Sequence, residues 1–131
     1  MFSFKETPFN RALRFEMNRV GPATEVTMPV EEWFMQENGI VHGGMIASLA
    51  DTAAVYALVA KLKESEQITS IEFKINFLRP ARMNGGPLAP RATIVKRGQT
   101  IGLCDVDVSQ GGELVAKGLF TYILFMTQER S

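Results

Sequence analysis

The chain has 131 residues, of which 46% are hydrophobic and 21% charged, as is ordinary for a globular domain. Lysine plus arginine balances aspartate plus glutamate at 14 each, so the totals exclude the strongly basic character of many nucleic-acid-binding proteins. One cysteine excludes an intrachain disulfide, and with a single histidine the chain is too poor in ligands for a typical metal site.

The N-terminal part predicts a helix followed by a strand. Apolar residues recur every four positions within residues 4–17, which indicates a short amphipathic helix, and Gly21-Pro22 ends it. We therefore assign residues 1–20 to an N-terminal helical segment. In residues 23–30, valine and methionine alternate with glutamate and threonine, as is typical of a strand.

A long helix is expected at the centre of the chain, over residues 45–63. Its spacing is helical, and small residues lie on several of its sides: Ala47, Ser48, Ala50, Ala53, Ala54 and Ala57. Because small side chains let another backbone approach closely, we expect a sheet to wrap round this helix.

Four strands are predicted after the central helix, most of them joined by short glycine-containing turns. Pro87 and Pro90 predict an edge or a bulge at the start of the second strand. Consecutive strands of this kind favour an antiparallel sheet with one face covered by the helix, an α+β fold. The four strands cover residues 70–78, 91–97, 100–109 and 114–126.

The start of the central helix combines unusual residues. Asp51 lies among apolar neighbours, where an ionised carboxylate is costly unless it is paired or hydrogen-bonded. It could also face a strip of solvent or bond a hydroxyl such as Ser48 or Thr52. Gly43-Gly44 precedes the helix, whose first amides lack internal partners and could hold a developing oxyanion. Alone, the two glycines would indicate only a tight turn.

The spacing of Gly43 and Asp51 constrains any joint role. Eight residues of helix place them about 12 Å apart along one axis. Reacting groups must converge on one carbonyl within about 3–3.5 Å. If both groups act together, they come from two subunits, so a catalytic role requires a homodimer with two active sites at its interface.

The pattern Gln36…His42-Gly43-Gly44…Asp51-Thr52-Ala53, followed by the strand from Thr69 to Pro80, resembles the hotdog-fold acyl-CoA thioesterases. Within them it is most similar to the phenylacetate-pathway (PaaI-like) group. The resemblance covers residues 21–125. It implies a single hotdog domain over residues 1–131, with an antiparallel sheet wrapped round one long helix. It also implies a homodimer formed through sheet pairing and often a homotetramer.

The resemblance implies catalytic roles for four residues. The N–H of Gly43 would polarise the thioester carbonyl, and His42 would order the turn that presents it. The amide of Gln36 would assist at the thioester or position water. Asp51 would act as general base on water or as nucleophile through a mixed anhydride, and the sequence leaves both routes open.

Further residues would position the substrate. Thr69 or Ser70 falls where some family members place a hydroxyl that orients water, and the sequence does not decide between them. Gly44 lies at the same turn as Gly43. The candidates for contacting the nucleotide part of coenzyme A are Arg79, Arg82, Lys96, Arg97 and Gly98, although strand-end cations are equally often just solvated.

We therefore expect an acyl-CoA thioesterase that releases a small or medium acyl group as the free acid. The alternative is a non-catalytic acyl-CoA-binding or sensing module on the same fold. We expect no cofactor, no metal, no nucleic acid and no membrane contact, and a location in the cytoplasm, because neither a signal peptide nor a membrane-length apolar segment is evident. The acyl group, the pathway and the choice between dimer and tetramer stay open.

Overall fold

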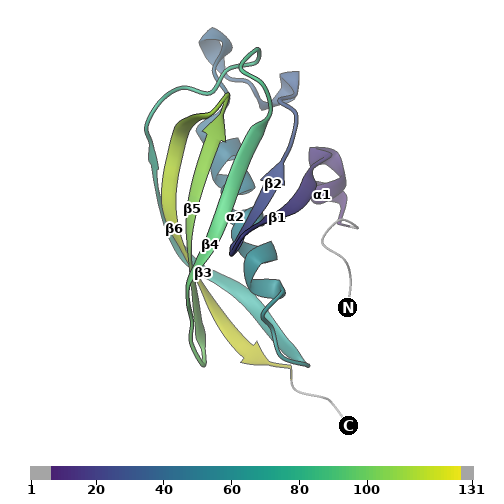
Figure 1. Cartoon of the computed structure of the whole chain (residues 1–131). Coiled ribbons are helices and arrows are strands. Elements are labelled where there is room, and N and C mark those ends of the chain that lie inside the picture. The colour runs from purple at the N-terminus through teal and green to yellow at the C-terminus, as the bar shows by residue number, and fades with distance from the viewer. Residues whose placement is uncertain (1–6, 128–131) are drawn as a thin grey trace.

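One antiparallel sheet of six strands curls round a single long helix in the computed structural model, which describes residues 7–127 (Figure 1). The strand order is β1-β2-β4-β5-β6-β3, and the expected α+β class is confirmed. The elements are α1 (Pro8–Leu13), β1 (Glu16–Val20), β2 (Ala23–Thr27), the 3₁₀ turns η2 (Glu32–Phe34) and η3 (Glu37–Gly39), α2 (Gly43–Val59), β3 (Glu66–Phe77), β4 (Leu88–Arg97), β5 (Ile101–Gln110) and β6 (Glu113–Met126).

Helix α2 forms the centre of the core because its inward side is built from small residues. Ala50, Ala53 and Ala54 are fully buried against the sheet. At Gly102 of β5 an added Cβ would lie 3.0 Å from the Leu58 side chain, so glycine is needed for that close approach. The prediction that a sheet wraps round a helix rich in small residues is confirmed.

The predicted N-terminal helix is wrong in its second half. Helix α1 ends at Leu13, and residues 16–20 form strand β1, which pairs antiparallel with β2. Gly21, with φ of +59°, opens the two-residue turn between them. A hairpin pairs both backbones there, whereas a longer helix would have buried only one stripe of side chains. Residues 1–6 of the predicted segment lie outside the described residues.

The prediction of an edge strand from Pro87 and Pro90 is also wrong. Strand β4 lies inside the sheet between β2 and β5. Its bulge lies between Ile94 and Lys96, away from both prolines. Pro90 is paired with Val108 of β5, but the ladder to β2 pairs only Ala92 and Arg91, so the missing N–H of the proline interrupts no paired position of the β2 ladder.

Within residues 7–127, strand β3 forms one edge of the sheet and is paired only with β6. It begins at Glu66, four residues before the predicted start, and has a bulge at Ile71. The exposed fractions of Ile71, Phe73 and Phe77 are 52%, 47% and 52%. Long apolar edge strands are templates for pairing with another chain. The opposite edge, β1, has only five residues.

Candidate active site

His42 caps the start of helix α2 and leaves one backbone donor unpaired. Its Nδ1 accepts a hydrogen bond of 2.9 Å from the N–H of Gly44, the second helical residue. The N–H of Gly43 finds no acceptor within residues 7–127. It lies at the positive end of the helix dipole, where a negative charge is stabilised. This geometry suits an oxyanion.

Two neighbours explain why the helix starts with glycines. A Cβ on Gly43 would lie 3.2 Å from the ring of Phe77, at the end of β3. A Cβ on Gly44 would lie 2.9 Å from the His42 ring, which folds back over that position to cap the helix. Glycine at both positions therefore lets two aromatic rings pack directly on the helix start.

Asp51 lies in the third turn of α2 and is partly buried. Its carboxylate Oδ1 accepts a hydrogen bond from the hydroxyl of Tyr122 on β6. The alternative of a bond to a neighbouring helix hydroxyl is wrong, because Ser48 donates to the Gly44 carbonyl and Thr52 donates to the Ser48 carbonyl. The Asp51 carboxylate is thus hydrogen-bonded by a residue of the sheet rather than by a hydroxyl of its own helix.

Tyr122 was not identified from the sequence. It lies 71 positions after Asp51, so no local spacing relates the two residues. The sequence gives one signal for it. Tyr122 falls at an inward-facing position of an alternating, β-prone segment, and a buried phenol there needs a hydrogen-bond partner for its hydroxyl.

The register of β3 separates the two hydroxyl candidates that the sequence could not separate. Ser70 is directly opposite Tyr122, and Thr69 is opposite Ile123. Directly opposed residues project from the same face of a sheet. Tyr122 points to the helix and is 1% exposed, whereas Ile123 is 40% exposed on the outer face. Ser70 therefore lies on the face that carries Asp51, and Thr69 lies on the opposite face.

Gln36 lies in the loop that leads into α2. Its N–H donates to the Ile40 carbonyl at 2.9 Å, and a bridge between Met35 and Val41 closes this loop. The His42 N–H donates to the Phe34 carbonyl at 2.8 Å, which fixes the loop against the helix start. The side chain of Gln36 is exposed and finds no partner in the described part of the chain.

Two of the cations lie at the same end of the sheet as Gly43. Arg79 forms an ion pair with Glu113, and the backbone of Arg82 is held by the side chain of Gln110 through bonds of 2.8 and 2.6 Å. The two arginines line a cavity of about 440 Å³. The Val41 N–H bonds the Ala81 carbonyl at 2.8 Å, which joins this loop to the approach to α2.

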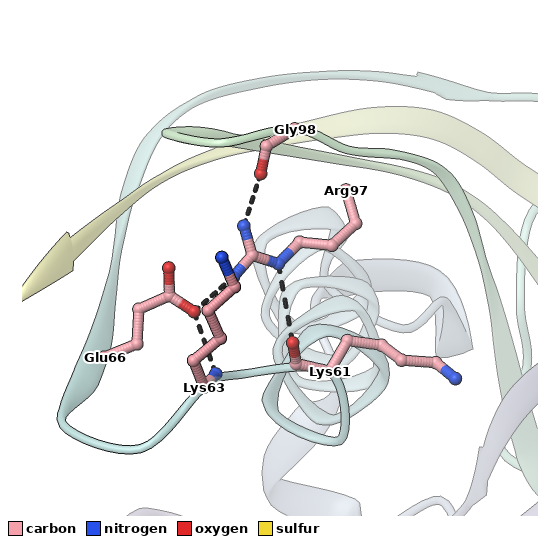
Figure 2. Close-up of polar contacts among 5 residues, drawn as sticks. All are labelled: Lys61, Lys63, Glu66, Arg97 and Gly98. Carbon is pink, nitrogen blue, oxygen red and sulfur yellow. Dashed lines mark hydrogen bonds and ion pairs between the residues drawn. The ribbon is translucent and has the colours of Figure 1, made fainter.

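The other two cations lie at the far end of α2 (Figure 2). The Arg97 guanidinium donates to the Glu66 carboxylate, to the Gly98 carbonyl and, at 3.4 Å, to the Lys61 carbonyl. The Arg97 and Glu66 side chains are only 17% and 5% exposed. The Lys63 N–H, bonded to Glu66 at 2.9 Å, lowers the pKa of that carboxyl most, and Arg97 lowers it further.

The predicted nucleotide-contacting residues therefore fall into two separate groups. Gly102 pairs with Arg97, and Gln110, eight residues further along β5, bonds Arg82. At the rise of a strand this spacing is roughly 26 Å. Lys96 is exposed at the Arg97 end. One protomer thus does not bring all the predicted cations together.

Other chemistry finds little support in the described residues. Cys104 is fully buried and burial raises the pKa of its thiol to about 12, so it has no thiolate character. Within residues 7–127, no three or more His, Cys, Asp or Glu side chains gather as a metal site would require. None of the helices there combines the length and the apolar character needed to span a bilayer.

An antiparallel sheet of six strands curled round one long helix is the architecture of the hotdog class. Residues 38–117 match the family model of the thioesterase superfamily. Acyl-coenzyme A thioesterase 13 of Mus musculus is 31% identical over 123 residues, which cover 90% of this chain and 86% of the mouse protein. The chain belongs to the thioesterase superfamily and is a thioester hydrolase.

Solved structures agree with this assignment. A thioesterase from Haemophilus influenzae has a TM-score of 0.87 and 28% identity, covering 95% of this chain and 87% of that one. A phenylacetic acid degradation-related protein from Ralstonia eutropha has a TM-score of 0.82 and 26% identity, covering 89% and 90%. The expected resemblance to the phenylacetate-pathway group is confirmed. Alignments with curated relatives span between 46% and 86% of their lengths.

Proposed function

We propose that the protein hydrolyses an acyl-CoA thioester at a site shared by two copies of the chain. The Gly43 N–H of one protomer would bind the developing oxyanion, and Asp51 of the partner subunit would activate water or attack the carbonyl itself. Support for the substrate comes from the similarity to mouse acyl-coenzyme A thioesterase 13, which covers most of both chains.

The observation that carries this proposal is that Gly43 and Asp51 lie on one uninterrupted helix. Helix α2 runs from Gly43 to Val59 without a break, so eight residues and about 12 Å separate the two groups along its axis. One copy of the helix cannot direct both groups at a single carbonyl carbon. A two-fold symmetric pair can, and it then contains two equivalent sites.

The exposed edge of β3 supports the required dimer. It is an edge of twelve residues whose outward backbone groups are unpaired in residues 7–127, and it carries exposed Ile71, Phe73 and Phe77, whereas the β1 edge has five residues. Pairing β3 with its copy would satisfy the open backbone groups and cover the apolar side chains. Because Phe77 packs on Gly43, this interface would lie next to the helix start. Further association of dimers into a tetramer stays a prediction.

The proposed reaction adds water to the thioester carbonyl carbon. Asp51 takes one proton from the water as the C–O bond forms, and the carbonyl oxygen becomes an oxyanion bound by the Gly43 N–H. Collapse of this intermediate breaks the C–S bond, and coenzyme A leaves as a thiolate that takes up a proton. The alternative nucleophilic route forms a mixed anhydride on Asp51, which water then cleaves to the same two products.

Three further assignments complete the proposed site. Ser70 rather than Thr69 would orient the water, because only Ser70 shares a face with the Tyr122–Asp51 pair. Ser70→Ala should then lower turnover, and equal losses for Ser70→Ala and Thr69→Ala would contradict this choice. Gln36 would act from the loop before the helix. Arg79 and Arg82, at the Gly43 end, are our preferred contacts for the nucleotide phosphates.

The first test measures free thiol release from a panel of acyl-CoA thioesters. Asp51→Asn should lower turnover by about 10²–10⁴-fold, because a base or nucleophile is lost while the amide oxygen can still accept from Tyr122. Asp107→Asn is the matched control, since Asp107 bonds Lys117 on an exposed part of the sheet. Parent turnover in Asp51→Asn would end the assignment. Tight binding without thiol release by the parent would favour a non-catalytic acyl-CoA-binding module.

The second test asks whether the site is shared between protomers. Asp51→Asn and Gly43→Pro chains with different tags are co-expressed, and the mixed dimers contain one site with both native groups. In a random mixture of dimers, about a quarter of the parent sites are restored. No recovery above the activities of the two single variants would show that both groups act within one chain or do not act together.

A further inference from the structure

Tyr122 makes a contact with Asp51 that has no role in the reaction proposed above. Its side chain is 1% exposed between β6 and α2, and its hydroxyl donates to Oδ1 of Asp51. The same hydroxyl lies 3.3 Å from the Asp51 backbone carbonyl oxygen. A buried phenol is thus directed at one oxygen of the proposed catalytic carboxylate, from a strand 71 positions away in the chain.

We infer that Tyr122 is a positioning residue for thioester hydrolysis: it holds Asp51 by Oδ1 and leaves Oδ2 for water or for the thioester carbonyl. This inference rests on the proposed role of Asp51. An ionised carboxylate offers acceptor positions on both oxygens, and rotation about its last torsion exchanges them at low cost. A fixed donor on one oxygen removes that freedom.

The hydroxyl remains a donor throughout the range in which the enzyme can work. Burial, the largest cause, raises the pKa of Tyr122 far above its ordinary value, and the negative charge of Asp51 raises it further. A neutral phenol has one proton to donate, and an ionised carboxylate can only accept it. The contact therefore does not alternate between donating and accepting as the pH changes.

A structural tie between β6 and α2 is the competing explanation of this contact. It predicts that Tyr122→Phe, which keeps the ring and its packing, lowers the melting temperature and leaves turnover per folded site unchanged. A positioning role predicts a change in the chemical step itself. Kinetics normalised to folded protein therefore separate the two explanations.

The experiment compares kcat and KM of Tyr122→Phe, Tyr56→Phe and Asp51→Asn in steady-state thiol release. Tyr56 is the matched control because it is the only other tyrosine. It is buried and packs edge-to-face on Phe15 at 5.4 Å, and its hydroxyl bonds Asn10 rather than Asp51. Folding of each variant is checked by circular dichroism melting.

We expect Tyr122→Phe to lower kcat by about 10- to 100-fold with KM unchanged, as small displacements of reacting groups do. Tyr56→Phe should keep the parent kcat and the parent KM. Adding Tyr122→Phe to Asp51→Asn should cause little further loss, since one residue acts through the other.

Parent kcat in Tyr122→Phe, while Asp51→Asn is inactive, would overturn this inference and leave the proposed function intact. Equal losses in both tyrosine variants would also overturn it, because any buried hydroxyl would then matter equally. An active Asp51→Asn enzyme would instead overturn the proposed function, and the role of Tyr122 with it.

Discussion

The two ends of helix α2 are held in opposite ways. At its start, one imidazole nitrogen caps one N–H, and the N–H of Gly43 has no partner in the described residues. At its other end, the Arg97 guanidinium reaches a carboxylate and two backbone carbonyls, from Glu66, Gly98 and Lys61 (Figure 2). The first end keeps one N–H without an acceptor in the described residues, whereas the second end is hydrogen-bonded to β3 and to the β4–β5 turn.

This difference separates the groups available for chemistry from those that hold the fold. A donor that binds a transition state must be without a strong partner in the resting enzyme, because an existing bond would have to be broken first. An ion pair shielded from solvent is useful only when its hydrogen bonds are filled, as they are around Arg97. Substitutions at the helix start should therefore change turnover, and substitutions at its end should change stability.

Among substitutions that compare the two ends of α2, the largest expected effect follows from removing the Gly43 N–H. Gly43→Pro deletes this donor at the first helical position, where proline is tolerated and the residue before it already has an extended ψ of 131°. We expect kcat for thiol release to fall by about 10²–10³-fold, the cost of one oxyanion donor. The melting temperature should change little.

Gly43→Ala is the matched control, because it keeps the N–H and adds the same Cβ that would lie 3.2 Å from the Phe77 ring. A loss shared equally by both variants would trace the effect to crowding at Phe77 rather than to the donor. A clear difference between proline and alanine at this position measures the N–H itself.

Local patterns predicted the order of the strands and the central helix from β2 onward, and long-range contacts account for what the sequence left out. Alternation and small-residue content located the strands and the central helix, because those signals lie within a few residues of each other. The pairing of Tyr122 with Asp51 spans 71 positions, and that of Arg97 with Glu66 spans 31. No periodicity relates positions so far apart, and only the sheet register brings them together.

The errors near the N-terminus have the same origin. In the sequence alone, the four-residue spacing of Phe9, Leu13 and Met17 fits an amphipathic helix. Pairing of Met17 with Val26 across a hairpin instead decides the conformation of that segment. Of the predicted site, the His42-Gly43 turn was evident because it is local. The choice of Ser70 over Thr69 required the register with β6.

The next largest effect compares two arginines from the two ends. Arg97→Met should lower the melting temperature by about 5 °C, because Glu66 loses its ion-pair partner in a site that is 5% exposed. Arg97→Lys should restore only part of this loss, since one ammonium cannot reproduce the planar fork of donors. Turnover at saturating substrate should be unchanged in both variants. The measurements are calorimetry and thiol release.

Arg82→Met provides the opposite case at the Gly43 end, where the proposed site lies. Its guanidinium is exposed beside the 440 Å³ cavity, so we expect an unchanged melting temperature and a KM for acyl-CoA raised about two- to fivefold. If Arg97→Met raised KM and Arg82→Met did not, the nucleotide would bind at the far end of α2, and the division between the two ends would have to be redrawn.

The smallest expected effect is a pH dependence at the Arg97 end. Hydrogen bonding from the Lys63 N–H and contact with Arg97 lower the pKa of Glu66 from its usual 4.5. A carboxyl whose folded pKa is depressed adds stability at pH values above its unfolded pKa, and this stability is lost as the pH falls through the folded pKa. The contribution should therefore be complete above about pH 4.5 and disappear below it.

Glu66→Gln isolates this contribution, because the amide keeps an acceptor for both donors but does not titrate. Its melting temperature should fall less steeply than that of the parent between neutral pH and the acidic range below 4.5. Glu64→Gln, two residues earlier on an exposed turn, should follow the parent curve. Parallel curves for the parent and Glu66→Gln would mean that ionisation of this carboxylate adds nothing to the stability of the protein. The carbonyls bound by Arg97 would then be sufficient to hold this end of α2.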